Sequence, residues 1–435
     1  MKTHAQRWLS QEARALLTRL DRIKPFVLHE TMVPAAAPSL AAQTAIERYL
    51  VNGRQELRGR IKAFLFWLQS PEGQTASLAE AQRNFTLLKM RFNNILSQFD
   101  IFADVITQRS ERENGVWLSG LDAVAADALA IPGNYFDPPP VVCHLDRGHG
   151  AAIRRARTRL PGGGKNPVAV VRVPRERMVS SGIASSLVHE VGHQGAALLD
   201  LINSVRRRLH QAEQNSNGSS PFWALFARWI SEILADFWSV SRVGVGSTMG
   251  LMGVVSLPRA FVFRISLDDP HPIPWIRVKL SCAMGKALYP DPQWERLAAM
   301  WEGYYPLTGL SPSRQRFFAA VEAHIPQFIR LLVNHRPSSL QGRSLGEVMT
   351  FADRRSGHLR QLHQTWRGRP ERMNQAAPSL AFAVIGQARA DGRLTPEQEG
   401  PLLIDLLTYW ALLNTLNASA ICATQMRSNG IALAV

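Results

Sequence analysis

Apolar residues recur at helical spacing along the first part of the chain. From about Gln6 to Asp127 they return every three or four positions, which places them on one face of a helix. The segment Ser70–Gly73 predicts a turn between two long helices, because proline and glycine interrupt the helical pattern there. We therefore expect an antiparallel helical domain over residues 1–130. The two apolar stripes are Ile46, Tyr49, Leu50, Leu57, Ile61, Phe64 and Leu68, and Leu87, Leu88, Phe92, Ile95 and Phe99.

A second helical region is predicted at the end of the chain, over residues 307–435. Leu402–Leu416 forms one apolar stripe there, and another precedes it. Neither helical region contains a motif to which chemistry can be assigned. The earlier stripe consists of Phe317, Val321, Ile325, Ile329 and Leu332.

The pattern changes between these regions. Ile131–Pro140 is rich in proline, glycine and asparagine, and such a run cannot continue a helix. Two short apolar runs follow, Val141–Leu145 and Val168–Val173, which are typical of strands. An apolar helix comes next. The predicted fold class is therefore mostly α, with a small α+β core over residues 131–306.

The helix after the second strand carries two histidines four residues apart. His189 and His193 lie on one face of it, so both imidazoles can reach a single metal ion. Glu190 is displaced around the helix, where its carboxylate can accept a proton from water instead of binding metal. Zinc lowers the pKa of a bound water and polarises a carbonyl group, which is the chemistry of peptide hydrolysis.

This motif is only moderately specific, because two surface histidines beside a helical glutamate can match it by chance. The residues around the motif favour one interpretation over the other. Leu187, Val188 and Val191 make the helix apolar around the motif, and Gly192 leaves room beside the second histidine. These neighbours favour a buried metal site over a displayed surface.

A catalytic zinc needs a third protein ligand, and two glutamates compete for the role. Glu213 lies in a polar stretch that runs toward a predicted loop, whereas Glu232 lies in a strongly apolar helix. Asp236 follows Glu232 by one turn on the same face, where it can accept the free N–H of a ligating histidine. Burying two carboxylates on one helix is costly unless cationic partners compensate them. We therefore predict Glu232 as the third ligand.

The segment His189–His193, followed by Glu232 and by Asp236 one turn later, resembles the gluzincin zinc metallopeptidases. The resemblance implies Zn²⁺ as cofactor, Glu190 as general base and Asp236 as the partner of a ligating histidine. It covers about Val168–Leu280. Glu213 has the separation from the histidine pair that thermolysin-like members show, but lacks the aspartate one turn later.

A likeness to soluble relatives of the CAAX-protease and stress-protease group rests on Asp268–Arg277, which contains a His-Pro step and a downstream arginine. His271 is braced by prolines, and near zinc it could donate to the oxyanion of the reaction. The alternative is a loop histidine that pairs with Asp268 or Asp269. Arg277 could orient Asp236 or the substrate, but a salt-bridged surface residue is the simpler interpretation.

Three further side chains offer weaker candidates. Tyr304 and Tyr305 could bind an oxyanion through a phenol, although tyrosines of the core or of an interface are more common. Cys143 could hold zinc in a latent state, but we expect an inert buried cysteine.

Composition limits the class of protein. The chain of 435 residues has a formal net charge of +16, carried mostly by arginine and spread along the sequence. No basic helix interleaved with aromatics is present, so we expect no specific nucleic-acid partner. With only three cysteines, no disulfide framework is implied, which agrees with a reducing compartment.

The predicted localisation is cytoplasmic. The first residues lack the apolar core of a signal peptide. Leu402–Cys422 is apolar but contains Asp405, Asn414 and Asn417, so we expect a buried helix and no membrane span.

The sequence thus predicts a zinc-dependent endopeptidase acting on a protein or peptide substrate. We expect the strand near Val168–Val173 to be an edge strand that pairs with the extended substrate. The alternative is a non-catalytic, zinc-stabilised scaffold whose helical regions bind a protein partner. Cleavage specificity and oligomeric state are left open.

Overall fold

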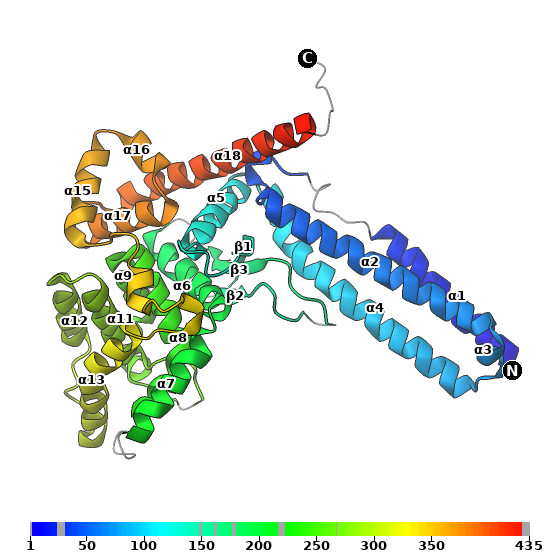
Figure 1. Ribbon diagram of the computed structural model, residues 1–435, viewed down its shortest axis with the longest axis horizontal. Coiled ribbons are helices and arrows are strands. Elements are labelled where there is room, and N and C mark those ends of the chain that lie inside the picture. The colour runs from blue at the N-terminus through cyan, green and yellow to red at the C-terminus, as the bar shows by residue number, and fades with distance from the viewer. Residues whose placement is uncertain are drawn as a thin grey trace.

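A computed structural model describes residues 2–23, 31–147, 150–160, 163–175, 180–215, 222–266 and 268–428. The chain is mostly helical, with 74% of its residues in helices, and contains a small three-stranded sheet. This confirms the predicted combination of a mostly α chain with a small sheet. Figure 1 shows a long helical arm that extends from a larger helical body.

The N-terminal arm contains four helices: α1 (Lys2–Arg22), α2 (Leu40–Gln69), α3 (Pro71–Thr75) and α4 (Leu78–Thr107). Ser70 ends α2, and its hydroxyl accepts a hydrogen bond from the N–H of Gly73. The predicted break between the two long helices is confirmed, although it contains the short helix α3 in place of a simple turn. The apolar stripe of α2 is buried apart from Tyr49, which is half-buried. Leu87 was placed on the apolar face of α4 but is 59% exposed, whereas Leu88 is buried as predicted. Phe85, which the predicted stripe did not include, is also buried.

The helix α5 (Arg112–Leu129) follows the 3₁₀ turn η2 (Gln108–Ser110) and packs with the larger body. Its buried side chains, including Leu118 and Leu121, join the core of the body and not that of the arm. The helix ends just before the proline-rich segment 131–140. A helix-to-strand change therefore occurs where the sequence predicts it, although α5 itself belongs to the core of the body.

The sheet contains β1 (Val141–Asp146), β2 (Ala152–Arg154) and β3 (Ala169–Pro174) in the order β1-β3-β2. The pair β1–β3 is parallel, and β2 runs antiparallel to β3. The two predicted strands are confirmed, whereas β2 was missed because three residues carry no periodic signal. The prediction that Val168–Val173 is an edge strand is wrong, since β2 covers that side of β3.

The sheet lies between the two hydrophobic cores. Val142 and Val170 pack into the core of the arm, while Cys143 and Val171 point to the opposite face and join the core of the body. This alternation follows from the two-residue period of a strand. The sheet therefore joins the arm to the body, as Figure 1 shows.

The outer edge of β1 is occupied by side chains. The guanidinium of Arg109 donates to the carbonyl of Cys143 at 2.6 Å, and Asp122 accepts from the N–H of the same residue at 2.6 Å. Gln108 forms the corresponding pair of bonds with the backbone of Leu145, at 2.8 and 2.7 Å. β2 holds the other edge position of the described sheet.

The described residues at the centre of the body form the helices α6 (Ser181–Leu198), α7 (Leu201–Asn215), α8 (Phe222–Val243), α9 (Val245–Val255), α10 (Arg259–Val262), α11 (Pro274–Leu288) and α12 (Gln293–Tyr304). α6 and α8 approach closely because Gly192 has no side chain. A Cβ atom there would lie 2.8 Å from Cα of Ala235. This contact sets α8 directly against the helix that carries the two histidines.

The C-terminal region is helical, as predicted, and comprises α13 (Pro312–Val333), α14 (Leu345–Met349), α15 (Ser356–Arg367), α16 (Pro370–Gln375), α17 (Pro378–Ala390) and α18 (Pro396–Ser428). The expectation of a buried helix over Leu402–Cys422 is correct only for its first half. Trp410 and Ala411 are buried, whereas Leu416 is 67% exposed and Ile421 is 48% exposed. By length and composition alone, the segment Pro396–Thr424 could cross a membrane, a test that a core helix also passes.

Candidate metal centre

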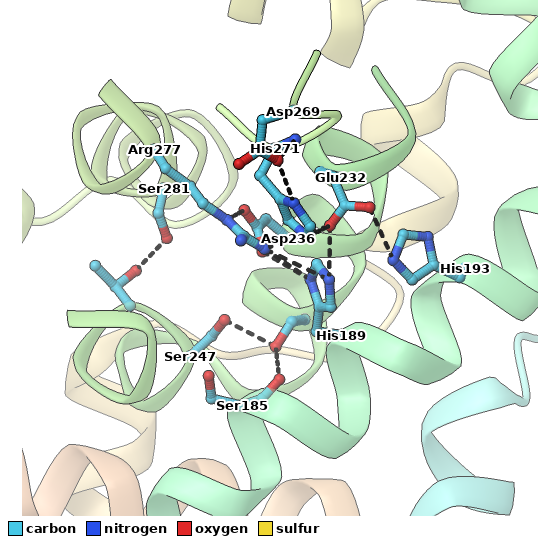
Figure 2. A network of polar contacts seen from close by, with 12 residues as sticks. Ser185, His189, His193, Glu232, Asp236, Ser247, Asp269, His271, Arg277 and Ser281 are labelled. Carbon is cyan, nitrogen blue, oxygen red and sulfur yellow. Dashed lines mark hydrogen bonds and ion pairs between the residues drawn. The ribbon is translucent and has the colours of Figure 1, made fainter. Parts of the chain in front are cut away.

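His189, His193 and Glu232 converge between α6 and α8. One ligand atom from each lies within 4.8 Å of the others, and the sequence predicted these three residues as metal ligands. Figure 2 shows the Glu232 carboxylate facing both imidazoles. Oε2 of Glu232 is 3.2 Å from Nε2 of His189, and Oε1 is 3.4 Å from Nε2 of His193.

These separations fit a shared metal ion. Zinc bonds of about 2.0–2.1 Å in a tetrahedral arrangement separate two ligand atoms by roughly 3.3–3.4 Å. Both histidines present Nε2 to the cluster, and two imidazoles with one carboxylate form a known donor set of catalytic zinc. The donor types of the three residues therefore suit zinc, and the two separations between Glu232 and the histidines match those of a shared ion.

Charge is concentrated in this cluster. Burial alone would raise the pKa of Glu232, but hydrogen bonds from His189 and His193 outweigh it and hold this pKa well below its usual range. Burial alone would lower the pKa of His189, yet Asp236 and Glu232 raise it to about 9. The two acids thus favour a cation between them, whether a proton on the imidazole or a metal ion at Nε2.

Asp236 lies one turn beyond Glu232 on α8 and fixes the orientation of His189. Its Oδ1 is 2.8 Å from Nδ1 of His189, and a carboxylate can only accept there, so Nδ1 keeps its proton and Nε2 is the atom at which a metal ion can replace the second proton. Arg277 on α11 donates to both oxygens of Asp236, at 2.7 and 2.9 Å. The interpretation of Arg277 as a surface residue is therefore wrong, since its side chain is 12% exposed and faces Asp236.

Ser231 holds the second imidazole in a similar way and was missed in the sequence. Its hydroxyl lies 3.3 Å from Nδ1 of His193 and can accept that N–H. Ser231 directly precedes Glu232, but its role depends on how α8 faces α6, which the sequence does not reveal. Both histidines thus have a partner at Nδ1.

Glu190 is buried and lines the same cavity as the three converging residues, which has a volume of about 430 Å³. It lies outside the metal-binding cluster. Residues 151–153 and Arg155, on and beside β2, line the opposite side of this cavity. A carboxylate that faces the cavity without joining the cluster is available to exchange protons with a substrate or a water.

His271 lies at the mouth of this cavity and is half exposed. Its Nε2 is 3.3 Å from Oε2 of Glu232, while its Nδ1 is 2.8 Å from Oδ1 of Asp269. Both interpretations of His271 are therefore partly realised, because it pairs with Asp269 and also reaches the cluster. With Nδ1–H donated to Asp269, donation from Nε2 requires the imidazolium form.

The remaining candidates lie elsewhere. Glu213 pairs with His210 on α7, at 3.6 Å, and is not part of the cluster. Tyr304 is 64% exposed, and the hydroxyl of Tyr305 donates to the carbonyl of Leu257. Cys143 is fully buried in the body core, and burial raises the pKa of its thiol well above the usual range. It has the properties expected of an inert cysteine.

Comparison of the chain with protein-family models, with curated proteins and with solved structures finds no match. The function of the site must therefore be inferred from its own residues and geometry.

Proposed function

We propose that the protein is a zinc-dependent endopeptidase, with His189, His193 and Glu232 as metal ligands and Glu190 as general base. One observation carries this proposal. The carboxylate of Glu232 stands between two Nε2 atoms at 3.2 and 3.4 Å, while Glu190 faces the same cavity outside the cluster. Three donors and one separate carboxylate are the set that metal-assisted hydrolysis requires.

Different residues of the chain transfer the protons and position the metal ligands. Zinc, when bound, polarises the scissile carbonyl and acidifies water. Glu190 takes a proton from the attacking water as the C–O bond forms, and returns it to the nitrogen as the C–N bond breaks. Asp236 and Ser231 keep both Nδ1–H groups engaged, so each Nε2 presents its lone pair to the cluster.

The sheet supports an extended substrate. β2 borders the cavity and holds one edge position of the described sheet, while side chains occupy the opposite edge, that of β1. An extended peptide can add to such an edge through main-chain hydrogen bonds. We therefore assign substrate pairing to β2 and no longer to Val168–Val173. The resemblance to gluzincins, and to soluble relatives of the CAAX-protease and stress-protease group, also supports a peptidase.

The test combines metal content with cleavage. Purified protein should contain one zinc per chain and cleave members of a peptide library, and Glu190→Gln should keep the zinc and lose the cleavage. Zinc without cleavage by the wild-type protein would favour a zinc-stabilised scaffold that binds a protein partner. Protein without zinc, even after incubation with zinc and removal of the excess, would contradict both functions.

A further inference from the structure

A second, larger cavity lies on the other side of β2. Its volume is about 820 Å³, nearly twice that of the cavity at the metal centre. It is enclosed by the C-terminal part of α4 and by all three strands. Ala152, Ile153 and Arg155 line both cavities, so the two spaces meet along β2.

The charges in this cavity favour an anion. Three arginines and two aspartates line it. Arg172 is paired with Asp146 at 2.8 Å, while Asp104 on α4 is exposed. The structure gives the side chains of Arg154 and Arg155 no hydrogen-bond or ion-pair partner among the described residues.

One further polar group in the lining lacks a partner. Nδ1 of His144 on β1 is buried and makes no hydrogen bond with any described residue. An unpaired buried polar atom is costly, so the lining around His144 is not fully satisfied by the described residues alone. A carboxylate can accept from two guanidinium groups at the same time.

We propose that this cavity binds acidic side chains of the substrate, with Arg154 and Arg155 as the residues that set the preference. The proposal rests on the proposed peptidase function and specifies its substrate class. A peptide strand added to β2 points alternate side chains to opposite faces of the sheet. One set faces the metal centre, and the other set faces the cavity that contains Arg154.

This alternation predicts which positions of the substrate should prefer an acidic side chain. A single glutamate moved along an otherwise neutral peptide should favour the reaction most at positions two residues apart, where it faces both arginines. The effect should be smaller at the positions between them, where it can meet only Arg155, which also lines the cavity at the metal centre. The peptides carry an amidated C-terminus, so that an effect of the side-chain carboxylate is separated from one of the terminal carboxylate. A preference seen only with a free C-terminus would overturn the assignment to acidic side chains.

Binding can be measured without turnover. Glu190→Gln protein should bind a fluorescent glutamate-containing peptide at least tenfold more tightly than its glutamine counterpart, as expected for charge-assisted hydrogen bonds. The difference should shrink with added salt. Equal affinity for the two peptides would overturn the proposal. Tighter binding of a single-stranded oligonucleotide than of either peptide would assign the arginines to a different class of ligand, and would also overturn it.

Matched variants test the two arginines. Arg155→Gln and Arg154→Gln should each reduce the preference for the acidic peptide by roughly tenfold, with unchanged affinity for the neutral one. Arg157→Gln is the control, because Arg157 belongs to the same loop but pairs with Asp137 and does not line the cavity. An equal loss in the control would indicate a general effect of charge and contradict the proposal.

Different results would contradict the acidic preference and the peptidase function. If wild-type protein cleaves neutral and acidic peptides equally and Glu190→Gln cleaves neither, the peptidase function stands and the acidic preference is wrong. If no peptide is cleaved but the acidic peptide still binds through Arg154 and Arg155, the assignment of the cavity to acidic side chains is supported and the hydrolytic function is wrong.

Discussion

Arg277 donates two hydrogen bonds to Asp236, and Asp236 in turn accepts the Nδ1–H of His189. The chain of contacts runs from α11 through α8 to α6 and ends at a proposed metal ligand (Figure 2). Burial alone would raise the pKa of Asp236, but Arg277 and His189 outweigh it and keep this pKa well below its usual range. Asp236 therefore stays ionised and fixes the tautomer of His189.

Asp236→Asn should lower zinc affinity by about 10–100-fold, the scale seen when a partner of a ligating histidine is replaced. An amide can still accept from Nδ1–H, but it lacks the charge that makes the imidazole a better ligand. Competition with a chromogenic chelator measures the affinity. Asp353→Asn, which removes a partly buried partner of the exposed Arg355, is the control. Equal affinities in the two variants would contradict a role of Asp236 in metal binding.

Glu232→Ala should yield protein without zinc, whereas Glu213→Ala should retain it. The first change removes the only carboxylate of the described cluster, and the second removes a partner of His210 on another helix. Elemental analysis of the purified variants gives the zinc content directly. If Glu213→Ala loses zinc and Glu232→Ala keeps it, the ligand assignment is wrong.

Glu190→Gln should retain zinc and lower kcat by about 10²–10⁴-fold, because the amide cannot accept a proton from the attacking water. Thermal unfolding should be nearly unchanged, since the substitution conserves size. The rate is measured on a peptide that the wild-type protein cleaves, with metal content determined on the same sample. Wild-type turnover in this variant would exclude Glu190 as the base.

Local signals in the sequence predicted the cluster. The spacing of four residues places His189 and His193 on one helix face, and it places Asp236 one turn after Glu232. Each pair could therefore be predicted without knowing how the helices pack. Choosing Glu232 over Glu213 also used a local property, the apolar context of its helix. Assigning strands 141–145 and 168–173 required only short apolar runs between turn-forming residues.

The features that were missed depend on tertiary contacts. Ser231 meets His193 only because Gly192 lets α6 and α8 approach. The edge position of β2 follows from a pairing order that no local pattern reveals. Arg277 is buried because α11 packs against α8, and nothing in its own neighbourhood distinguishes it from a surface arginine.

His271→Ala should lower kcat by about 10²-fold or more if the imidazolium donates to the oxyanion, while zinc content and substrate binding stay close to wild type. The reason is that this interaction forms only as charge develops on the carbonyl oxygen. Asp269→Asn should give a smaller loss, because it removes the partner at Nδ1 and leaves Nε2 in place. A lower melting temperature with normal turnover per folded molecule would instead assign a structural role to His271.

The last prediction concerns the ion pair behind β1. Arg109 and Asp122 have side-chain exposures of 0% and 5% and lie 2.9 Å apart, and together they hold the backbone of Cys143. Arg109→Ala would leave the Asp122 carboxylate buried without its cation, so we expect the free energy of unfolding to fall by about 3–5 kcal/mol.

Urea denaturation followed by circular dichroism gives this value, with Arg175→Ala as the matched control. Arg175 pairs with Glu111 at 3.3 Å on the surface, where its side chain is 54% exposed. Removing an exposed pair should cost about 1 kcal/mol or less. Equal losses in the two variants would show that Arg109 does not hold the edge of β1. In that case the buried ion pair would not explain why a substrate pairs with the edge of β2 and not with the edge of β1.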